Sequence, residues 1–306
     1  MNKKIVGVSA VLGAVAGVIG YKVGKRNQDT DKNEDLSETP LVSVIMATYN
    51  DKPEYIKQSL ESVVNQTYRN IEILIIDDST DEESKMALDS YAKDPRVRIY
   101  REEEKLGFVA SLNKGLSLAT GDLVARMDVD DIADLHRFVK QVKYLQVYPF
   151  TDILGGQIDI VDENGNKTGH RSYPLGGLKL IAFFTMRTPV AHPTVMFRRK
   201  IVDEGHRYDE SFKKAEDIDF WIRMYNEGYR FSNLPDTIVD FRVESGFMEK
   251  RVTNHDQENY VLKARRKNFT WRRPFFSVAD LTMSYVRKLT PDRLKAVTYR
   301  KENGVT

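Results

Sequence analysis

Residues 41–50 read LVSVIMATYN, and residues 71–80 read IEILIIDDST. Each stretch begins with a run of apolar residues rich in Val and Ile, which is typical of a strand buried on both faces of a sheet. Each run then stops at polar residues, Thr48-Tyr49-Asn50 in the first and Asp77-Asp78-Ser79-Thr80 in the second. The two stretches therefore predict a parallel sheet with polar side chains at the carboxyl ends of its strands.

Helical spacing of apolar residues alternates with short strand patterns along residues 41–131. Helices are predicted near residues 55–64, 86–91 and 107–119, and two more strands at 97–100 and 122–127. This alternation predicts an α/β fold, a mostly parallel sheet flanked by helices and joined by right-handed crossovers.

The pattern changes after residue 150. Asn164-Gly165 lies between strand patterns at 153–161 and near Arg171, and is the signal of a two-residue hairpin turn. Further strands are predicted at 195–198 and 238–243, and helices at 178–184 and 217–225.

A third strand end carries the acids Asp128-Val129-Asp130-Asp131. In an open parallel sheet, ligands bind beyond the carboxyl ends of the strands, so we expect the three polar strand ends to meet there. Carboxylates crowded at one edge repel one another unless a cation or hydrogen-bond donors separate them. A divalent cation that also binds a diphosphate meets that need. The alternative is that these Asp residues only end turns, and two acid pairs after two buried strands favour the cation site.

The amino-acid composition limits which metal sites and catalytic nucleophiles the chain can contain. The 306 residues contain no Cys and five His, which excludes a disulfide scaffold, thiolate zinc sites, iron–sulfur clusters and a Cys nucleophile. A metal must be held by oxygen or imidazole ligands, and a hard cation bound by carboxylates is the better expectation.

Five motifs together resemble glycosyltransferase family 2. They are VSVIMATYN, SLESVVNQTY, IEILIIDDST, GFVASLNKGLSLATGDLVARMDVDD and AEDIDFWIRM, in the order and spacing of that family over residues 41–245. The resemblance implies the nucleotide-sugar-binding fold called GT-A. It also implies inverting transfer of a hexose from a nucleotide-sugar donor, with UDP as the expected nucleotide.

The resemblance also implies roles for single residues. Thr48, Tyr49 and Asn50 would line the base pocket, Asp78 would accept a hydrogen bond from the base, and Gly107 and Asn113 would lie near the nucleotide. Asp128 and Asp130 match the family's DXD motif. Asp128 would lie towards the ribose and metal, Asp130 would hold Mn²⁺ or Mg²⁺, and Asp131 would lie behind them.

Residues of the second half would serve the acceptor side. Glu216-Asp217 matches the family's Glu-Asp pair, in which Asp217 would be the general base. The run that begins at His192 would lie near the acceptor and the donor sugar. His192 itself could be a metal ligand or an acceptor contact; an ordinary histidine before a proline turn is the alternative. Arg223 could hold an acid or a phosphate.

Three further side chains are interpreted from their positions in the predicted elements. Arg126, within a buried strand next to the acids, is expected to pair with one of them. Phe220 and Trp221 are expected in the core rather than as platforms on which a sugar stacks.

The two ends of the chain differ from the body. Residues 261–306 carry 12 Lys/Arg against three Asp/Glu, whereas the remainder carries 35 against 42. The basic tail suggests a polyanion, either a phospholipid surface or a nucleic acid, but the acidic body is not suited to lie along a phosphate backbone, so we expect no nucleic-acid partner. Aromatic residues and arginines at 268–289 suggest an amphipathic segment at a membrane interface. A terminal helix packed on the domain is the alternative.

Residues 5–21 form an apolar run between basic residues. We expect residues 1–26 to be a membrane anchor; a cleaved signal peptide or a segment that does not insert are the alternatives. Because nucleotide sugars are made in the cytosol, an anchor would leave the catalytic domain facing the cytoplasm.

The chain is thus divided into a 1–26 anchor, a 27–40 polar linker, a 41–250 catalytic domain and a 251–306 basic helical extension. Within the domain, 41–135 would bind the nucleotide and 136–250 the acceptor, a hydroxyl of a lipid-linked or cell-envelope glycan.

Two other functions are alternatives to sugar transfer. An inactive, membrane-tethered glycan-binding scaffold would have lost the metal motif or the base, and a sugar-phosphate nucleotidyltransferase would need a Gly-rich basic loop after the first strand. The intact acids and the loop Tyr49-Asn50-Asp51-Lys52-Pro53 favour neither.

Overall fold

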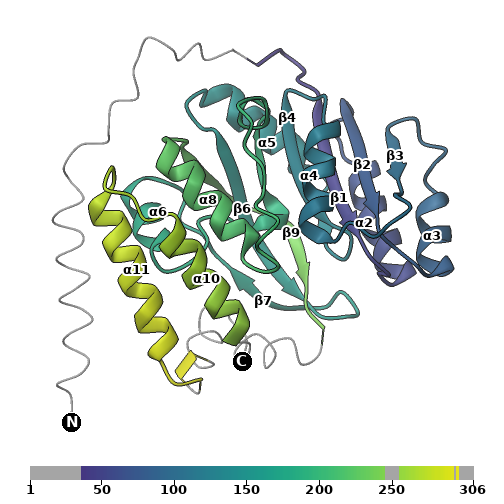
Figure 1. Ribbon diagram of the computed structural model, residues 1–306. Coiled ribbons are helices and arrows are strands. Elements are labelled where there is room, and N and C mark those ends of the chain that lie inside the picture. Colours follow the sequence, from purple (N-terminus) through teal and green to yellow (C-terminus); the bar gives the residue numbers. More distant parts are fainter. Residues whose placement is uncertain (1–35, 245–254, 293, 296–306) are drawn as a thin grey trace.

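The computed structural model describes residues 36–244, 255–292, 294 and 295 (Figure 1). Within these residues one sheet has the strand order β3-β2-β1-β4-β8-β6-β9-β5, with β7 paired on β6. The strands are β1 Val42–Thr48, β2 Ile71–Asp77, β3 Val97–Tyr100, β4 Leu123–Asp128, β5 Ile132–Ala133, β6 Ile153–Val161, β7 Lys167–Arg171, β8 Met196–Arg198 and β9 Phe231–Arg242. The helices are α2 Pro53–Val64, α3 Glu82–Asp89, α4 Phe108–Leu118, α5 Arg137–Val147, α6 Gly177–Phe184, the 3₁₀ helix η1 His192–Thr194, α7 Lys200–Asp203, α8 Glu216–Glu227, α10 His255–Lys267 and α11 Pro274–Leu289.

The predicted parallel strands and crossovers are confirmed for the first half of the chain. Strands β3, β2, β1 and β4 are neighbours and all parallel. The register pairs Thr48 with Asp77 and Ala47 with Asp128. The three polar strand ends therefore reach the same edge of the sheet, as expected from the sequence.

The prediction of a mostly parallel sheet is wrong for the second half. Strand β8 runs antiparallel to both β4 and β6, and of the eight pairings among the described strands four are parallel and four antiparallel. The sequence pattern also missed β5, α5, α7 and the first seven residues of β9. The predicted two-residue hairpin is a longer connection over residues 162–166, because the Asp162 carboxylate accepts hydrogen bonds from the amides of Asn164 and Asn166.

Helices pack against the sheet (Figure 1), and two clusters of buried apolar residues form the cores between them. Along β1, Val42, Val44 and Met46 point into a core shared with α2, α3 and α5, whereas Ile45 points into a second core with α4, α6 and α8. This alternation is the period of two of a strand, and it explains why the strand must be apolar on both faces.

Helices α10 and α11 pack on the second core. Phe276 of α11 is buried against Phe184 and Tyr225, with ring centroids 5.4 and 4.5 Å away. Arg265 of α10 and Asp280 of α11 form a buried ion pair. The alternative considered for this segment, a terminal helix packed on the domain, therefore holds for the inner face of α11.

Neither α10, α11 nor any other helix within 36–244 and 255–292 is long and apolar enough to cross a membrane. The anchor expected at residues 1–26 lies outside the described residues, as does most of the expected linker.

Candidate active site

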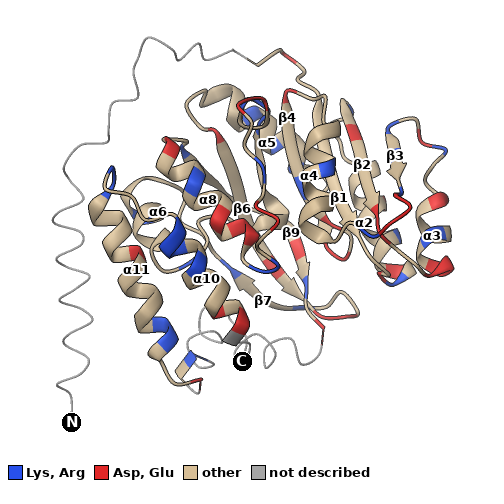
Figure 2. Cartoon of the chain, viewed as in Figure 1, with Lys and Arg blue, Asp and Glu red and all other residues tan. Residues whose placement is uncertain are grey.

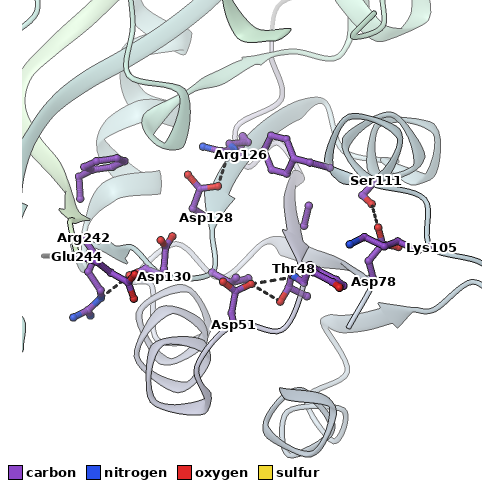
Figure 3. A pocket seen from close by; sticks show the side chains of 15 residues that line it. Thr48, Asp51, Asp78, Lys105, Ser111, Arg126, Asp128, Asp130, Arg242 and Glu244 are labelled. Atoms are coloured by element: carbon purple, nitrogen blue, oxygen red, sulfur yellow. Dashed lines mark hydrogen bonds and ion pairs between the residues drawn. The ribbon is translucent and has the colours of Figure 1, made fainter. Parts of the chain in front are cut away.

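The carboxyl ends of β1, β2 and β4 open into a cavity of about 600 Å³ (Figure 3). It is lined, among others, by Thr48 and Tyr49 after β1, Asp78 after β2, and Asp128 and Asp130 after β4. These five residues were all expected at the nucleotide or metal site. The structure therefore brings the three predicted strand ends together around one hollow.

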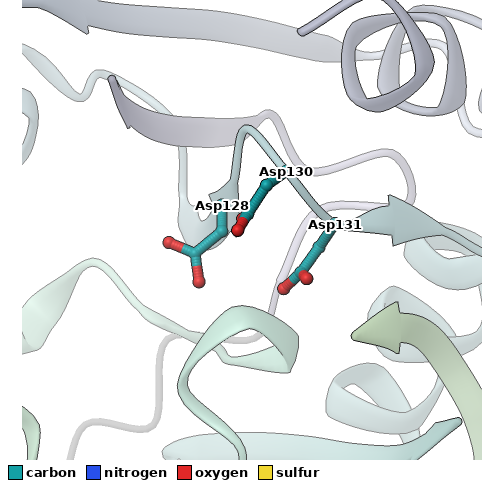
Figure 4. Close-up of side chains that lie close together, drawn as sticks. All are labelled: Asp128, Asp130 and Asp131. Carbon is teal, nitrogen blue, oxygen red and sulfur yellow. The ribbon is translucent and has the colours of Figure 1, made fainter. Parts of the chain in front are cut away.

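Three carboxylates gather at the end of β4. Asp128, Asp130 and Asp131 each offer an oxygen, and these oxygens lie within 4.8 Å of one another (Figure 4). Burial, followed by the charges of Asp128 and Asp51, raises the pKa of Asp130 to about 7. Burial and the neighbouring acids raise the pKa of Asp131 well above its usual range. Burial and mutual repulsion therefore disfavour the charged form of these carboxylates when no cation lies between them.

One oxygen of Asp131 shows that the cluster fits a cation. Asp131 is fully buried, and its Oδ1 accepts a hydrogen bond from the Arg242 amide at 2.8 Å. Its Oδ2 is buried and has no hydrogen-bond partner among the described residues. Three hard oxygen donors with one unsatisfied buried oxygen match the ligand preference of Mg²⁺ or Mn²⁺.

Arg126 supplies the nearest positive charge. Its guanidinium forms an ion pair with Asp128, from the same strand, as expected from the sequence. Arg126 is itself buried, and the charge of Asp128 raises its pKa against the opposing effect of burial.

A fourth carboxylate was missed by the sequence analysis. Asp51 lines the cavity and accepts hydrogen bonds from the Thr48 hydroxyl at 2.8 Å and the Tyr49 amide at 3.1 Å. Burial and the charge of Asp128 are among the causes that raise its pKa. The hydrogen bond from Thr48 fixes Asp51 beside the acid cluster, and its place directly after the predicted Thr48-Tyr49-Asn50 strand end was the only available signal.

Asp78 organises the opposite end of the cavity. Its Oδ2 accepts hydrogen bonds from the Gly107 amide at 2.7 Å and the Ser111 hydroxyl at 3.2 Å, and its Oδ1 from the Leu106 amide at 3.2 Å. Gly107 has φ +85°, a conformation that favours glycine, where α4 begins. Asp78 thus fixes the start of α4, while its Oδ1 can accept a further hydrogen bond.

Lys105 was also missed by the sequence analysis. Its ammonium lies 3.0 Å from the ring centroid of Tyr49, and both residues line the cavity (Figure 3). The half-exposed ring of Tyr49 and this cation form an aromatic, positively charged edge near Asp78.

Three residues expected at the nucleotide do not belong to the described lining of the cavity: Asn50, Gly107 and Asn113. Asn50 has φ +53°, and its amide side chain bonds to Thr80, so it joins the loops after β1 and β2. Asn113 bonds to both the amide and the carbonyl of Tyr208, so it attaches α4 to the second half of the chain. These contacts attach both side chains to distant loops of the chain, and their expected place at the nucleotide stays a prediction.

The Glu216-Asp217 pair begins α8. Ala215, directly before it, has φ +59°, and this sharp entry starts the helix at the two acids. Burial and the neighbouring Asp217 raise the pKa of Glu216 to about 7, while Arg126 and Asp128 also act on it. Neither acid is among the described residues that line the cavity, but the first turn of α8 lies within electrostatic reach of Arg126 and Asp128.

The remaining predictions concern residues in and around the second core. His192 is buried, its Nε2 lies 2.9 Å from the Tyr208 hydroxyl, and burial lowers its pKa well below the usual range. It is therefore a neutral core histidine, and it is absent from the acid cluster. Phe220 and Trp221 are fully buried, which confirms the core interpretation. Arg223 bonds to the Asp219 carboxylate at 2.9 Å, so the acid that was one of its two expected partners is present.

Strand β9 holds the acid cluster in place through contacts that the sequence did not predict. The Arg242 guanidinium donates to the Asp130 carbonyl at 2.8 Å, and it lies 4.3 Å from the ring of Tyr55 on α2. Arg242 and Glu244 complete this side of the cavity, and Glu244 forms an ion pair with Lys52 at 2.8 Å.

The sequence matches the profile of Glycosyl transferase family 2 over residues 43–205. The amylovoran biosynthesis glycosyltransferase AmsE of Erwinia amylovora is 34% identical over 269 residues, which are 86% of this chain and 99% of that protein. Among solved structures, S. aureus TarS 1–349 in complex with UDP-GlcNAc is similar with a TM-score of 0.64 at 20% identity, over 85% of this chain and 76% of that one. The mannosyltransferase PcManGT of Pyrobaculum calidifontis, in complex with GDP-Man and Mn²⁺, is similar with a TM-score of 0.63 at 17% identity, over 87% and 78%. The two structures agree with the fold, and the profile and the relative show that this chain belongs to glycosyltransferase family 2 and is a glycosyltransferase.

Proposed function

We propose that this glycosyltransferase moves a hexose from a nucleoside diphosphate sugar to a hydroxyl group, with inversion at the anomeric carbon. The observation that carries the proposal is the acid cluster Asp128, Asp130 and Asp131 at one end of a cavity whose other end holds Tyr49 and Asp78. In this arrangement the end with the acid cluster would bind a cation and the diphosphate, and the end with Tyr49 and Asp78 would bind the nucleobase. UDP is the proposed nucleotide; the similar structures were solved with UDP-GlcNAc and with GDP-Man.

Asp128 and Asp130 would hold a divalent cation, Mn²⁺ or Mg²⁺, with Asp131 behind them. When bound, such a cation supplies positive charge that stabilises the diphosphate as it leaves. The chain's own contribution is to hold the acids in place: Arg242 fixes Asp130 through its carbonyl and Asp131 through its carboxylate. Arg126 balances Asp128.

Asp217 would remove the proton from the acceptor hydroxyl. The acceptor oxygen then forms a bond to the anomeric carbon from the side opposite the diphosphate, while the bond from that carbon to the diphosphate oxygen breaks. Support comes from the position of α8: the charges of Arg126 and Asp128 influence the pKa of its first residue, Glu216, so the start of this helix lies near the cavity. A general base of this kind contributes a factor of about 10²–10⁴ to the rate.

We further propose a lipid-linked or cell-envelope glycan as the acceptor, with residues 1–26 as a membrane anchor and the catalytic domain on the cytoplasmic side. The relative AmsE, named for amylovoran biosynthesis, supports a role in the assembly of a glycan. The apolar run of residues 5–21 between basic residues supports the anchor.

A donor screen tests the proposal. The purified full-length protein is incubated with UDP-, GDP- and dTDP-hexoses, with Mn²⁺, Mg²⁺ or EDTA, and the released nucleoside diphosphate is measured. We expect release from one nucleotide class, strongly reduced by EDTA. No binding or turnover of any donor, with a folded protein, would instead support an inactive scaffold of the same fold.

A further inference from the structure

Helix α11 carries an apolar face that points away from the protein. Phe275, Val278, Val286 and Leu289 are 56%, 50%, 47% and 81% exposed, and Trp271, just before the helix, is 78% exposed. We call these five residues the α11 face. Its helical members recur at intervals of three, eight and three residues, which places them on one side of the helix.

The opposite side of α11 is fixed to the protein, so the α11 face cannot turn inward. Phe276 is buried between Phe184 and Tyr225, and Asp280 is buried in its ion pair with Arg265. The Arg265 guanidinium also donates to the Thr185 carbonyl at 2.7 Å, which joins α10 to the end of α6.

Exposed cations border the α11 face. Arg272 precedes the helix, Arg287 and Lys288 lie in its last turn, and Arg266 of α10 contacts Tyr285 (Figure 2). Asp280 is the one acid between residues 269 and 291, and it is neutralised in the interior. The segment 269–291 is therefore net basic at its surface, and the acids beside its last turn, Glu258 and Asp292, pair with Lys295.

We propose that the α11 face lies on a membrane surface that contains anionic phospholipid. Aromatic and aliphatic side chains on one face of a helix, bordered by Arg and Lys, are the composition of helices that lie in the membrane interface. Trp271 and Tyr285 have the amphipathic rings that accumulate at headgroup depth, and each nearby cation adds attraction to anionic lipid. This proposal does not depend on the proposed sugar transfer.

A second copy of the chain fits this surface less well. Arg272 lies at one end of the α11 face, and Arg287 and Lys288 lie at the other. Whether two such helices pair in parallel or antiparallel, cations meet cations. An anionic bilayer instead offers opposite charge to both ends at once, so charge complementarity favours the lipid surface.

Trp271 makes the proposal directly measurable. The chain has two tryptophans, and Trp221 is fully buried, so iodide quenching of tryptophan fluorescence reports on Trp271. Full-length protein is titrated with phosphatidylcholine vesicles containing or lacking 30% phosphatidylglycerol. We expect the anionic vesicles to shift the emission to shorter wavelength and to reduce the quenching constant about threefold or more, and 1 M NaCl to weaken the effect. Full access of iodide to Trp271 at saturating anionic lipid would overturn the proposal.

The variant Phe275→Ser/Val278→Ser/Leu289→Ser tests whether the α11 face is the cause. Its matched control replaces three exposed apolar residues elsewhere, Met86→Ser/Val147→Ser/Leu175→Ser, which are 70%, 59% and 51% exposed. We expect the apparent affinity reported by Trp271 to fall about tenfold or more in the first variant and to be unchanged in the control. Equal affinities in the two variants would overturn the proposal. The predicted anchor at 1–26 could also bind vesicles, which is why the Trp271 signal, and not flotation of the whole chain, decides.

Two controls complete the test. Both variants must keep the wild-type circular dichroism spectrum; if the triple variant does not fold, Leu289→Ser alone, at the most exposed of the three positions, replaces it. Protein without vesicles is examined over a hundredfold range of concentration by light scattering. Dimerisation that protects Trp271 and is lost in the α11 variant would show that a second copy covers this face, and would also overturn the proposal.

Discussion

Arg126 and Asp128 are two residues apart on β4, and their side chains form an ion pair at the edge of the acid cluster. Residues at this spacing on a strand point to the same face, so a single strand end supplies both an acid and its counter-charge. Arg126 is almost fully buried and Asp128 is half-buried, which makes this pair part of the interior of the site.

Replacing Arg126 with Met is expected to destabilise the cation-free protein by about 3–5 kcal/mol, because it leaves a crowded group of carboxylates without its nearest positive charge. Added Mn²⁺ should restore more stability to this variant than to the wild type. Urea unfolding with and without Mn²⁺ measures both effects. Arg98→Met, which removes the exposed partner of Glu72, is the control and should lose less than about 1 kcal/mol.

Replacing Asp130 with Ala is expected to abolish cation-dependent binding of the nucleotide and the transfer reaction, while the fold stays intact. In the proposed site Asp130 would reach the cation through its side chain, whereas Arg242 holds its backbone carbonyl, which Ala retains. Calorimetric titration of UDP in the presence of Mn²⁺ is the measurement. Asp236→Ala, an exposed acid paired with Lys140, should behave as wild type; normal turnover of the Asp130 variant would remove this residue from the metal site.

Cation affinity is expected to depend on pH because the pKa of Asp130 is raised to about 7. Below that pH a proton competes with the cation, so the dissociation constant for Mn²⁺ should rise roughly tenfold for each pH unit that the pH falls below 7, and should level off above it. Titrations at pH 5.5, 6.5, 7.5 and 8.5 test this. A pH-independent affinity would show that the cation is not held by this group.

The same raised pKa predicts the stability of the cation-free protein. A carboxyl group whose folded pKa exceeds its unfolded value stabilises the fold when protonated, and this stability is lost as the pH rises through the folded pKa. The thermal midpoint of the wild type should therefore fall from pH 5.5 to 8 more steeply than that of Asp130→Asn. Parallel pH profiles of the two proteins would contradict the prediction.

The first half of the fold and the acid cluster could be predicted because the signals are local. Buried parallel strands need apolar residues on both faces, and the polar residue that ends each run marks the sheet edge. The pairing of Thr48 with Asp77 and of Ala47 with Asp128 then follows from parallel register alone.

The second half could not be predicted to the same extent because its contacts are long-range. Nothing near Arg242 in the sequence indicates that its guanidinium reaches the carbonyl of Asp130, 112 positions away. The hydrogen bonds between the Asn113 amide and the backbone of Tyr208, 95 positions away, have no local signal either. A strand is predicted at 195–198, but nothing in the three residues of β8 indicates that it lies antiparallel between β4 and β6.

Replacing Asp280 with Ala is expected to destabilise the packing of α10 and α11 by about 3–5 kcal/mol, since Arg265 would be left buried without its acid. Limited proteolysis near residue 271, between the two helices, should become faster. The control Asp256→Ala removes an exposed acid from the first turn of α10. Unchanged proteolysis of the Asp280 variant would show that the ion pair does not hold these helices.

Substitutions can distinguish the roles of Glu216 and Asp217, the two acids that begin α8. Asp217→Asn should bind the donor as the wild type does but lose a factor of about 10²–10⁴ in transfer rate, because an amide cannot accept the acceptor's proton. Glu216→Gln should lose less, since the proposed general base is Asp217 and burial raises the pKa of Glu216 to about 7, so that its proton is lost less readily than that of an ordinary carboxyl group. Single-turnover transfer rates over pH 5.5–9, with donor affinity measured separately, distinguish them. A larger loss in Glu216→Gln than in Asp217→Asn would move the general base to Glu216, and the rate of the wild type would then rise with pH around 7.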